Sequence, residues 1–548
     1  MRLDKSNYHF LIFVSAVLLF IPFLGVVHLF DWDEINFAES AREMLLTGNY
    51  GRVQINFEPF WEKPPLFFWM QCVSMKLFGI NEFASRFPNA ICGVVTLLTF
   101  YFIGKRQKNE KFGFVWALCY LGSFLPHFYF KSGIIDPWFN YFIFISIWLI
   151  HQSFGEKEKP VKFRYVLLGG ITSGLAVLIK GPVALLIVTL TVVAFYLMTK
   201  RKTGVELKYI FTFLISAFAI SFLWFGFELF KNGPWFLKEF VLYQIDLFLH
   251  PVAGHQEPIY YHFLVVFIGC FPLSIFALPK IYNRSSAQSE EMTRWMKTLF
   301  WVVMILFTIV KTKIVHYSSL SYFPLSFLAA SYLYELLDFR VKFNKSIFIL
   351  FIVIGTIFSL IFIALPLLAN HKEFIIPFIK DPFAIDCLNA NVTWSGWEPL
   401  IGVLYFSLII YVIISFKKTP SLSRLMTMFY ANALFIFFYL IAVVPKIEAY
   451  SQGPAISFYQ SMRGAEAYVY PYGFKSYAQY FYFQKPDHGN ANATNMQWLL
   501  HGAIDRDVYL VAKSTAKNEL DTIRELSFLK KDGGFLFYKR LKPDPTKP

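Results

Sequence analysis

Residues 10–34 read FLIFVSAVLLFIPFLGVVHLFDWDE. An uncharged apolar run of about 20 residues is long enough, as a helix, to cross the ~30 Å hydrocarbon layer of a bilayer. This run ends abruptly in three acids, Asp31, Asp33 and Glu34. It is too long for the apolar region of a signal peptide and lacks a small-x-small cleavage site. We therefore expect a permanent membrane helix, uncleaved, whose exit carries a dense group of carboxylates.

The composition extends this prediction to most of the chain. Of 548 residues, 56% are hydrophobic and 16% are charged, and the mean hydropathy is +0.48. Soluble proteins typically have about 25% charged residues, so the sequence predicts an α-helical polytopic membrane protein. Apolar segments of sufficient length number about thirteen. Their approximate limits are 8–30, 83–104, 112–130, 133–151, 163–180, 181–198, 207–230, 259–280, 294–311, 314–337, 345–369, 397–416 and 424–444.

The basic residues set the orientation. Lys and Arg number 51 against 36 acids, a net charge of +15. Much of this charge falls in alternate loops near 105–111, 157–164, 200–208, 280–297, 340–345 and 417–424. Cytoplasmic loops of membrane proteins carry such an excess. The charge thus indicates topology, and we expect no nucleic-acid partner. The five cysteines form no disulfide or zinc-binding pattern.

Four segments are predicted to lie on the outer side: 31–82, 231–258, 370–396 and 445–548. We expect a membrane domain over 1–444, with the first outer loop at 31–82, and a small α/β domain over 445–548. Strand-like runs in that domain cover 466–472, 476–483, 507–512 and 534–538, and helix-like runs cover 496–502 and 514–526.

The first outer loop predicts two amphipathic helices. Apolar residues recur at helical spacing at Ile35, Ala38, Ala41 and Leu45, which predicts a helix lying on the membrane surface. Asp33 is a candidate catalytic acid at its start. The alternative is that Asp31 and Glu34 form a capping box, which would be compatible with a catalytic Asp33.

A second helix follows the run Trp61-Glu62-Lys63-Pro64-Pro65. Pro65 suits a first helical turn, and about 14 residues are too few to span a membrane. Lys63 is thereby placed at the depth of the lipid headgroups, where an ammonium can bind a phosphate. The alternative is a snorkelling lysine without a ligand.

Further ionisable residues fall at the outer ends of predicted spans. Asp136 lies in Gly-Ile-Ile-Asp-Pro-Trp, and Lys311 and Lys313 precede His316 and Tyr317. Charge is costly near a membrane, so each is a functional candidate, with capping or snorkelling as the alternative. All converge on the face of the first outer loop. Acids and lysines between amphipathic rims suit an amphiphilic substrate with a phosphate head.

The motifs occur in an order that resembles a known family. They are Asp33-Glu34, Phe37-Ala38-Glu39-x-Ala41-Arg42-Glu43-Met44, Gly48-Asn49-Tyr50, Trp61-Glu62-Lys63-Pro64-Pro65, Phe78-Gly79-x-Asn81-Glu82-Phe83-x-x-Arg86-Phe87-Pro88, Gly174–Pro182, His255-x-x-Pro258-x-Tyr260-Tyr261 and Lys311-Thr312-Lys313-x-x-His316-Tyr317. Over most of residues 10–330 this pattern resembles the ArnT/protein-mannosyltransferase group, membrane glycosyltransferases of the GT-C fold (glycosyltransferase family 39/83-like).

The resemblance implies a function and roles for residues. The group transfers a sugar from a polyprenyl-phosphate carrier, usually undecaprenyl phosphate in bacteria, to an acceptor outside the membrane, such as lipid A, a cell-envelope glycan or a protein. Carried over residue by residue, the catalytic set is Asp33, Glu34 and Asp136, the donor-phosphate set is Lys63, Arg86, Lys313 and Tyr317, and the metal pair is Glu62 and His255. No cofactor is obligatory by this reading, with a divalent cation as an option, since a His–Glu pair supplies only two ligands. His255 satisfying a loop hydrogen bond is the alternative.

One departure bears on the acceptor. Aminoarabinose transferases usually have Arg-Tyr where this chain has Asn36-Phe37, which weakens any transfer of their sugar or lipid A specificity. The expected reaction is a single inverting displacement, at the outer face of a bacterial inner membrane. A transporter or flippase of lipid-linked sugars is the main alternative, although no internal repeat is visible. A non-catalytic subunit that shares the fold is a third.

Overall fold

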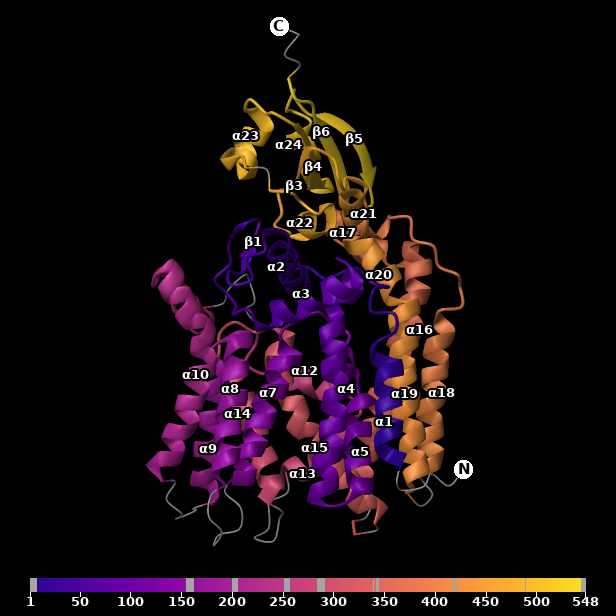
Figure 1. Ribbon diagram of the computed structural model, residues 1–548. Coiled ribbons are helices and arrows are strands. Elements are labelled where there is room, and N and C mark those ends of the chain that lie inside the picture. The colour runs from indigo at the N-terminus through magenta and orange to yellow at the C-terminus, as the bar shows by residue number, and fades with distance from the viewer. Residues whose placement is uncertain are drawn as a thin grey trace.

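The computed structural model describes residues 7–153, 162–199, 206–250, 257–282, 291–338, 340–341, 344–416, 420–487 and 489–543. Upright helices form a bundle, and a small sheet domain sits on one end of it (Figure 1). The helices of the bundle are α1 (Tyr8–Phe20), α4 (Glu82–Gln107), α5 (Glu110–Leu121), α6 (Phe124–Tyr129), α7 (Asp136–Ser153), α8 (Phe163–Lys180), α9 (Val183–Thr199), α10 (Leu207–Asn232), α12 (Tyr261–Gly269), α13 (Leu273–Tyr282), α14 (Glu291–Ile309), α15 (Tyr322–Leu337), α16 (Lys345–Asn370), α18 (Pro399–Phe416) and α19 (Leu422–Ala442).

Each of the predicted spans contains a helix, so the prediction of a helical, multi-pass membrane protein is confirmed. Within the described ranges, six helices (α4, α8, α10, α14, α16 and α19 with its extension) are individually long and apolar enough to cross a bilayer. Several others are shorter or broken. The predicted span 259–280 divides into α12 and α13 at Pro272, which has no N–H for a helical hydrogen bond.

The first span is shorter than predicted. Its helix, α1, ends at Phe20 instead of continuing to residue 30. The ammonium of Lys131 donates hydrogen bonds to the carbonyls of Leu19, Phe20 and Pro22 at 3.1, 3.2 and 2.9 Å. Carbonyls at and just beyond the C-terminus of a helix have no helical partner. The buried ammonium of Lys131 therefore caps the end of α1.

The start of α5 and the ends of α13 and α15 lie at the end of the bundle away from the sheet domain (Figure 1), and ion pairs join them there. Lys111 at the start of α5 donates to Asp338, after α15, at 3.0 Å. Lys280, in the last turn of α13, pairs with Glu335 of α15. The basic helix ends therefore gather on one side, as the distribution of charge predicts.

The predicted outer segments meet at the other end. Their elements are α2 (Asp33–Thr47), β1 (Gln54–Ile55), β2 (Glu58–Pro59), α3 (Leu66–Phe78), α11 (Trp235–Leu249), η3 (Lys372–Phe374), η4 (Ile376–Phe378), α17 (Pro382–Leu388), α20 (Val444–Ser451) and α21 (Gly453–Ser461). The lower end of the sheet domain lies just above α2, α17 and α21 (Figure 1). Lys531 of the domain donates to Asp386 of α17 at 2.6 Å, which ties two of these segments together.

The sheet domain contains four strands in the order β3-β4-β6-β5. β3 and β4 are parallel, and β6 pairs antiparallel with both neighbours. The elements are β3 (Ala467–Tyr472), α22 (Ala478–Phe483), η5 (Ala491–Thr494), α23 (Met496–His501), β4 (Asp507–Lys513), η6 (Ser514–Ala516), α24 (Lys517–Leu520), β5 (Ser527–Asp532) and β6 (Phe535–Arg540).

Three of the predicted strands are confirmed as β3, β4 and β6, but the strand predicted at 476–483 is wrong. That aromatic segment forms the helix α22, in which five of six side chains are buried. Strand propensity depends strongly on tertiary packing, and here the packing of these aromatic side chains overrides it. The helix predicted over 514–526 stops at Leu520 and is followed by the unpredicted strand β5, an exposed edge strand whose side chains give no alternating pattern.

Candidate active site

A cavity of about 580 Å³ lies between the bundle and the sheet domain. It is lined by the start of α2, the segment before α3, Ile135 before α7, the end of α8 at Lys180, one face of α11, the segment 312–317 and the loop between β3 and α22. Its lining includes Trp32, Asp33, Asn36, Phe37, Glu62, Lys63, Lys180, Tyr243, His316, Tyr317, Lys475 and Tyr477. Side chains from both ends of the sequence therefore meet at one charged cavity.

Two carboxylates flank a histidine at this cavity. Asp33 lies in the first turn of α2 and its side chain is 41% exposed. Its Oδ2 is 3.3 Å from Nε2 of His316, and Oδ2 of Asp136 is 3.8 Å from the same nitrogen. Asp136 begins α7 and is buried behind the wall. Asp33 is thus the carboxylate of the pair that faces the cavity.

Two lysines bring positive charge to the same wall. Lys180 donates to Oδ1 of Asp136 at 2.6 Å, and its ammonium lies 4.7 Å from the centre of the Tyr317 ring. It occupies the last turn of α8, which ends there because Gly181 adopts φ +101°, a conformation that favours glycine. Lys63 lies 3.8 Å from Glu62.

The environment of Lys63 lowers its pKa. Burial is the main cause because it disfavours the charged form, and nearby Lys180 acts in the same direction. Glu62, Asp33 and Asp136 oppose the shift. A lysine in this setting is poorly hydrated and gains most from a bound anion.

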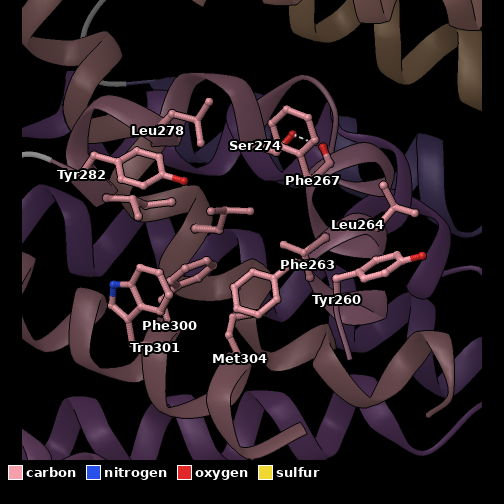
Figure 2. A pocket seen from close by; sticks show the side chains of 13 residues that line it. Tyr260, Phe263, Leu264, Phe267, Ser274, Leu278, Tyr282, Phe300, Trp301 and Met304 are labelled. Atoms are coloured by element: carbon pink, nitrogen blue, oxygen red, sulfur yellow. Dashed lines mark hydrogen bonds between the residues drawn. The ribbon is translucent and has the colours of Figure 1, made fainter. Parts of the chain in front are cut away.

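An apolar groove of about 450 Å³ adjoins the charged cavity. The two share Lys63, Lys180, Leu247 and Tyr317, and the rest of the groove is lined mainly by side chains of α9 and α11, with Phe139, Phe307 and Val310. An amphiphile could place a phosphate at the lysines and its tail in the groove. By contrast, a separate cavity of about 370 Å³ among α12, α13 and α14 is lined by aromatic and aliphatic side chains (Figure 2), and none of its described lining residues is an acid, lysine or histidine.

The predicted site residues separate into two groups. The structure brings Asp33, Glu62, Lys63 and Tyr317 to the cavity, with Asp136 directly behind it. Glu34, Arg86 and Lys313 do not line the cavity. His255, the other predicted metal ligand, lies outside the described residues.

Glu34 and Arg86 are buried together. The Arg86 guanidinium donates to both oxygens of Glu34, at 3.0 and 2.7 Å, and to the carbonyls of Leu24, Val27 and His28. Each side chain is 4% exposed. With its donors used in this way, Arg86 is placed to hold the end of the first span rather than a ligand.

Lys313 is also committed to the backbone. Its ammonium donates to the carbonyls of Thr308 and Val310, at 3.1 and 2.7 Å. These carbonyls belong to the C-terminal end of α14, where a cation is favoured. A helix-capping role accounts for this buried lysine.

The capping box predicted for Asp31 and Glu34 is absent. Oδ2 of Asp31 accepts hydrogen bonds from Ser476 Oγ and from the Tyr477 N–H, in the sheet domain. Oε2 of Glu34 does accept the Phe30 N–H at 2.9 Å, but Trp32 is the residue at the N-cap and its side chain makes no capping bond.

The surface placement predicted for α2 is also wrong. Its residues from Glu34 to Met44 are all buried, because the sheet domain covers the face that a surface helix would expose. The charged residues of that face, Glu39, Arg42 and Glu43, are at most 1% exposed. By contrast, α3 keeps Val73 and Leu77 exposed, as expected for a helix on a bilayer.

Sequence reasoning assigned no specific role to several lining residues. Lys180 and His316 lie inside the quoted motifs, and the signal was a charge next to an apolar span. Tyr243, Lys475 and Tyr477 come from segments without a motif. Their contribution depends on tertiary contacts, such as the 2.9 Å hydrogen bond that the Tyr243 hydroxyl donates to Glu62.

Comparisons with known proteins agree with this architecture. Residues 62–225 match the family model described as dolichyl-phosphate-mannose-protein mannosyltransferase. An undecaprenyl phosphate-alpha-4-amino-4-deoxy-L-arabinose arabinosyl transferase of Shewanella sediminis is 23% identical over 457 residues, 82% of this chain and 80% of the relative. An uncharacterized protein of Aquifex aeolicus is 26% identical over 67% of this chain and 71% of its own length.

Solved structures share the fold. The crystal structure of ArnT from Cupriavidus metallidurans bound to undecaprenyl phosphate superposes with a TM-score of 0.79 at 15% identity, over 98% of each chain. The archaeal oligosaccharyltransferase AglB of Archaeoglobus fulgidus gives 0.52 at 9% identity, over 99% of this chain and 75% of that one. In the order of its motifs, in the arrangement of its helices and in these likenesses, the chain is similar to the ArnT/protein-mannosyltransferase group of GT-C membrane glycosyltransferases.

Proposed function

We propose that this protein transfers a sugar from a polyprenyl-phosphate donor to an acceptor outside the membrane, by inverting displacement at the anomeric carbon. One observation carries the proposal: the charged cavity and the apolar groove meet at Lys63, Lys180 and Tyr317. A lipid-linked sugar phosphate needs these two environments side by side. The arabinosyl transferase relatives and the ArnT crystal structure, named for undecaprenyl phosphate, support this donor class.

In this proposal the donor phosphate lies between the two lysine ammoniums. Its prenyl chain follows the groove along α9 and α11, and its sugar points toward Asp33 in the charged cavity. Lys63 and Lys180 stabilise the charge that develops on the phosphate as its bond to the sugar breaks. Asp136 keeps Lys180 in place through the 2.6 Å ion pair.

The reaction then needs one displacement. An acceptor oxygen forms a bond to the anomeric carbon, the bond from that carbon to the phosphate oxygen breaks, and its electron pair stays on the phosphate. If the acceptor is a hydroxyl, Asp33 takes its proton; if it is an ionised phosphate oxygen, Asp33 orients the reactants. His316, 3.3 Å from Asp33, fixes the position of that carboxylate.

The expected metal pair is not used in this mechanism. Glu62 accepts a hydrogen bond from Tyr243 and lies next to the Lys63 ammonium. Within the described parts of the chain no three His, Cys, Asp or Glu side chains cluster as metal ligands. The described residues therefore do not by themselves form a metal site, and we assign no step to a metal.

We place the cavity and the domain of residues 445–548 on the periplasmic side of a bacterial inner membrane, above the membrane domain of residues 1–444. The basic ends of α4 and α5 lie at the opposite end of the bundle, which supports a cytoplasmic assignment for that end (Figure 1). Acceptors on the periplasmic side include lipid A, other cell-envelope glycans and proteins.

The test starts from a deletion strain. Mass spectrometry of its lipids and envelope glycans should show one acceptor lacking one sugar, restored by the wild-type gene. Asp33→Asn should fail to restore it while accumulating normally in the membrane, because the variant loses only the carboxylate. Asp246→Asn is the matched control, since this exposed acid of α11 pairs only with His250 in the described structure.

Purified protein distinguishes an enzyme from a flippase. Release of carrier phosphate only when donor and acceptor are both present supports transfer, with an inverted anomeric configuration in the product. Movement of intact sugar-lipid across liposomes without release would support the transporter instead. Wild-type turnover by Asp33→Asn would remove Asp33 from the mechanism.

A further inference from the structure

Three side chains form a corner of the charged cavity that the proposed mechanism does not use. Trp32 comes from the loop before α2, and Lys475 and Tyr477 come from the loop between β3 and α22. The two rings meet edge to face, with centroids 5.4 Å apart. The Lys475 ammonium lies 4.7 Å from the centre of the Trp32 ring and 5.5 Å from that of Tyr477.

Hydrogen bonds connect this corner to the segment that carries Asp33. Asp31 accepts hydrogen bonds from the Ser476 hydroxyl and from the Tyr477 N–H, at 3.4 Å for the latter. Ser476 and Asp31 are 445 residues apart in sequence. These hydrogen bonds therefore attach the β3–α22 loop to Asp31, which lies two residues before the proposed catalytic acid, Asp33.

Lys475 differs from the other lysines of the cavity. Lys63 and Lys180 each have a carboxylate partner, Glu62 and Asp136. The Lys475 ammonium lies over two aromatic rings, and it forms no ion pair with any residue that the structure describes. It is exposed and lines the charged cavity but not the apolar groove. Its ammonium is thus available to a ligand in the charged cavity, outside the apolar groove proposed for the prenyl chain.

We propose that Trp32, Lys475 and Tyr477 bind the acceptor, and that this acceptor carries a phosphate or carboxylate next to a sugar ring. Lys475 pairs with the anion, and the two aromatic rings contact the apolar face of the sugar. The sheet domain thereby helps to select the acceptor. This inference rests on the proposed function, which places the donor phosphate at Lys63 and Lys180.

The test measures binding to the full-length protein in nanodiscs that contain undecaprenyl phosphate, so that the donor phosphate site is occupied. The probe is glucosamine 1-phosphate, followed by saturation-transfer difference NMR, with N-acetylglucosamine as the uncharged comparison. Lys475→Ala should weaken binding of the phosphorylated probe about tenfold, the order of one charge-assisted hydrogen bond. Lys475→Arg should retain most of the binding.

Lys530→Ala is the matched control, because Lys530 is an exposed lysine of the same domain that pairs with Asp532 at 3.6 Å. It should bind the probe like the wild type. Equal binding by Lys475→Ala and the wild type, or no saturation of the probe in the wild type, would overturn the inference.

A separate measurement tests the proposed donor-phosphate site independently of the acceptor site. Undecaprenyl phosphate should raise the thermal unfolding temperature of the wild type and of Lys475→Ala equally. No rise in the wild type would count against the proposed donor site, whatever the sugar probe does. A rise in the wild type that Lys475→Ala loses would show that Lys475 serves the donor, and would overturn the acceptor assignment alone.

Discussion

Lys63 combines burial with a requirement for positive charge. Its environment lowers its pKa below the ordinary value of 10.5, so the ammonium is lost at a lower pH than for an exposed lysine. If the ammonium stabilises the leaving phosphate, the transfer rate should fall as pH rises through this lowered pKa. In Lys63→Arg the guanidinium stays charged to above about pH 12. The alkaline fall in the transfer rate should therefore shift to higher pH in this variant, even if its maximum rate is lower.

Profiles of initial rate against pH, from neutral to about pH 11, test this. The exposed lysine variant Lys530→Arg should leave the limb where the wild type has it. An identical limb in Lys63→Arg and the wild type would show that another group controls the alkaline loss.

Glu34 allows a stability test of its structural assignment. Because Arg86 is buried and donates to both of its oxygens, Glu34→Ala leaves an unpaired guanidinium in the interior. Breaking a buried pair in this way costs about 3–5 kcal/mol, so the variant should unfold at a clearly lower temperature in detergent. The double variant Glu34→Ala/Arg86→Met should recover part of the loss.

A stable but inactive Glu34→Ala would instead return this residue to the catalytic group that its sequence position suggests. Thermal unfolding and transfer rate must therefore be measured on the same preparation.

At the scale of elements, α2 is the part of the structure that its sequence describes least well. Its start, its length and its stop at Gly48 follow from apolar spacing and a glycine at φ +67°. The burial of α2 cannot be predicted from its local sequence, because the sheet domain that covers Glu39 and Arg42 comes more than 400 residues later. The same limit explains why Asp33 and Lys63 were found from local motifs while Lys475 and Tyr477 were not.

A buried polar cluster fastens α2 to the sheet domain. Arg42 donates to Glu39 at 2.6 and 2.7 Å and to the Lys485 carbonyl at 3.0 Å. The Lys485 ammonium donates to the Tyr470 hydroxyl at 2.8 Å and to Asn56 in the β1–β2 turn. One lysine thus connects the sheet with the first outer loop.

Lys485→Met should loosen this contact. It removes both hydrogen bonds and leaves Asn56 and Tyr470 without this partner, a loss of about 1–3 kcal/mol. Hydrogen exchange should increase in α2 and in the β1–β2 turn but not in the bundle helices, and Lys530→Met should leave exchange unchanged. Unaltered exchange in α2 would mean that the apolar contacts alone hold the domain.

At the scale of the whole molecule, the distribution of charge predicts which end faces the cytoplasm. Glu373 and Lys208 are exposed, at 64% and 62% of their side chains, beyond α16 and at the start of α10. Four native cysteines are buried and the fifth, Cys387, is partly exposed, so a Cys387→Ser background is suitable for labelling.

In that background, Glu373→Cys should react with a membrane-impermeant maleimide in cells whose outer membrane has been permeabilised. Lys208→Cys should react only after the inner membrane is opened. The reverse pattern would place the cavity in the cytoplasm and exclude an acceptor in the periplasm.

The bond between Asp31 and Ser476 has a consequence for biosynthesis. The segment that carries Asp31 leaves the ribosome 445 residues before Ser476, which lies in the loop that meets it across the cavity. During synthesis, Asp33, Lys63 and Lys180 are therefore present long before the loop that completes the cavity. Under the proposed function, transfer is therefore expected only after the loop that carries Ser476 has docked on Asp31.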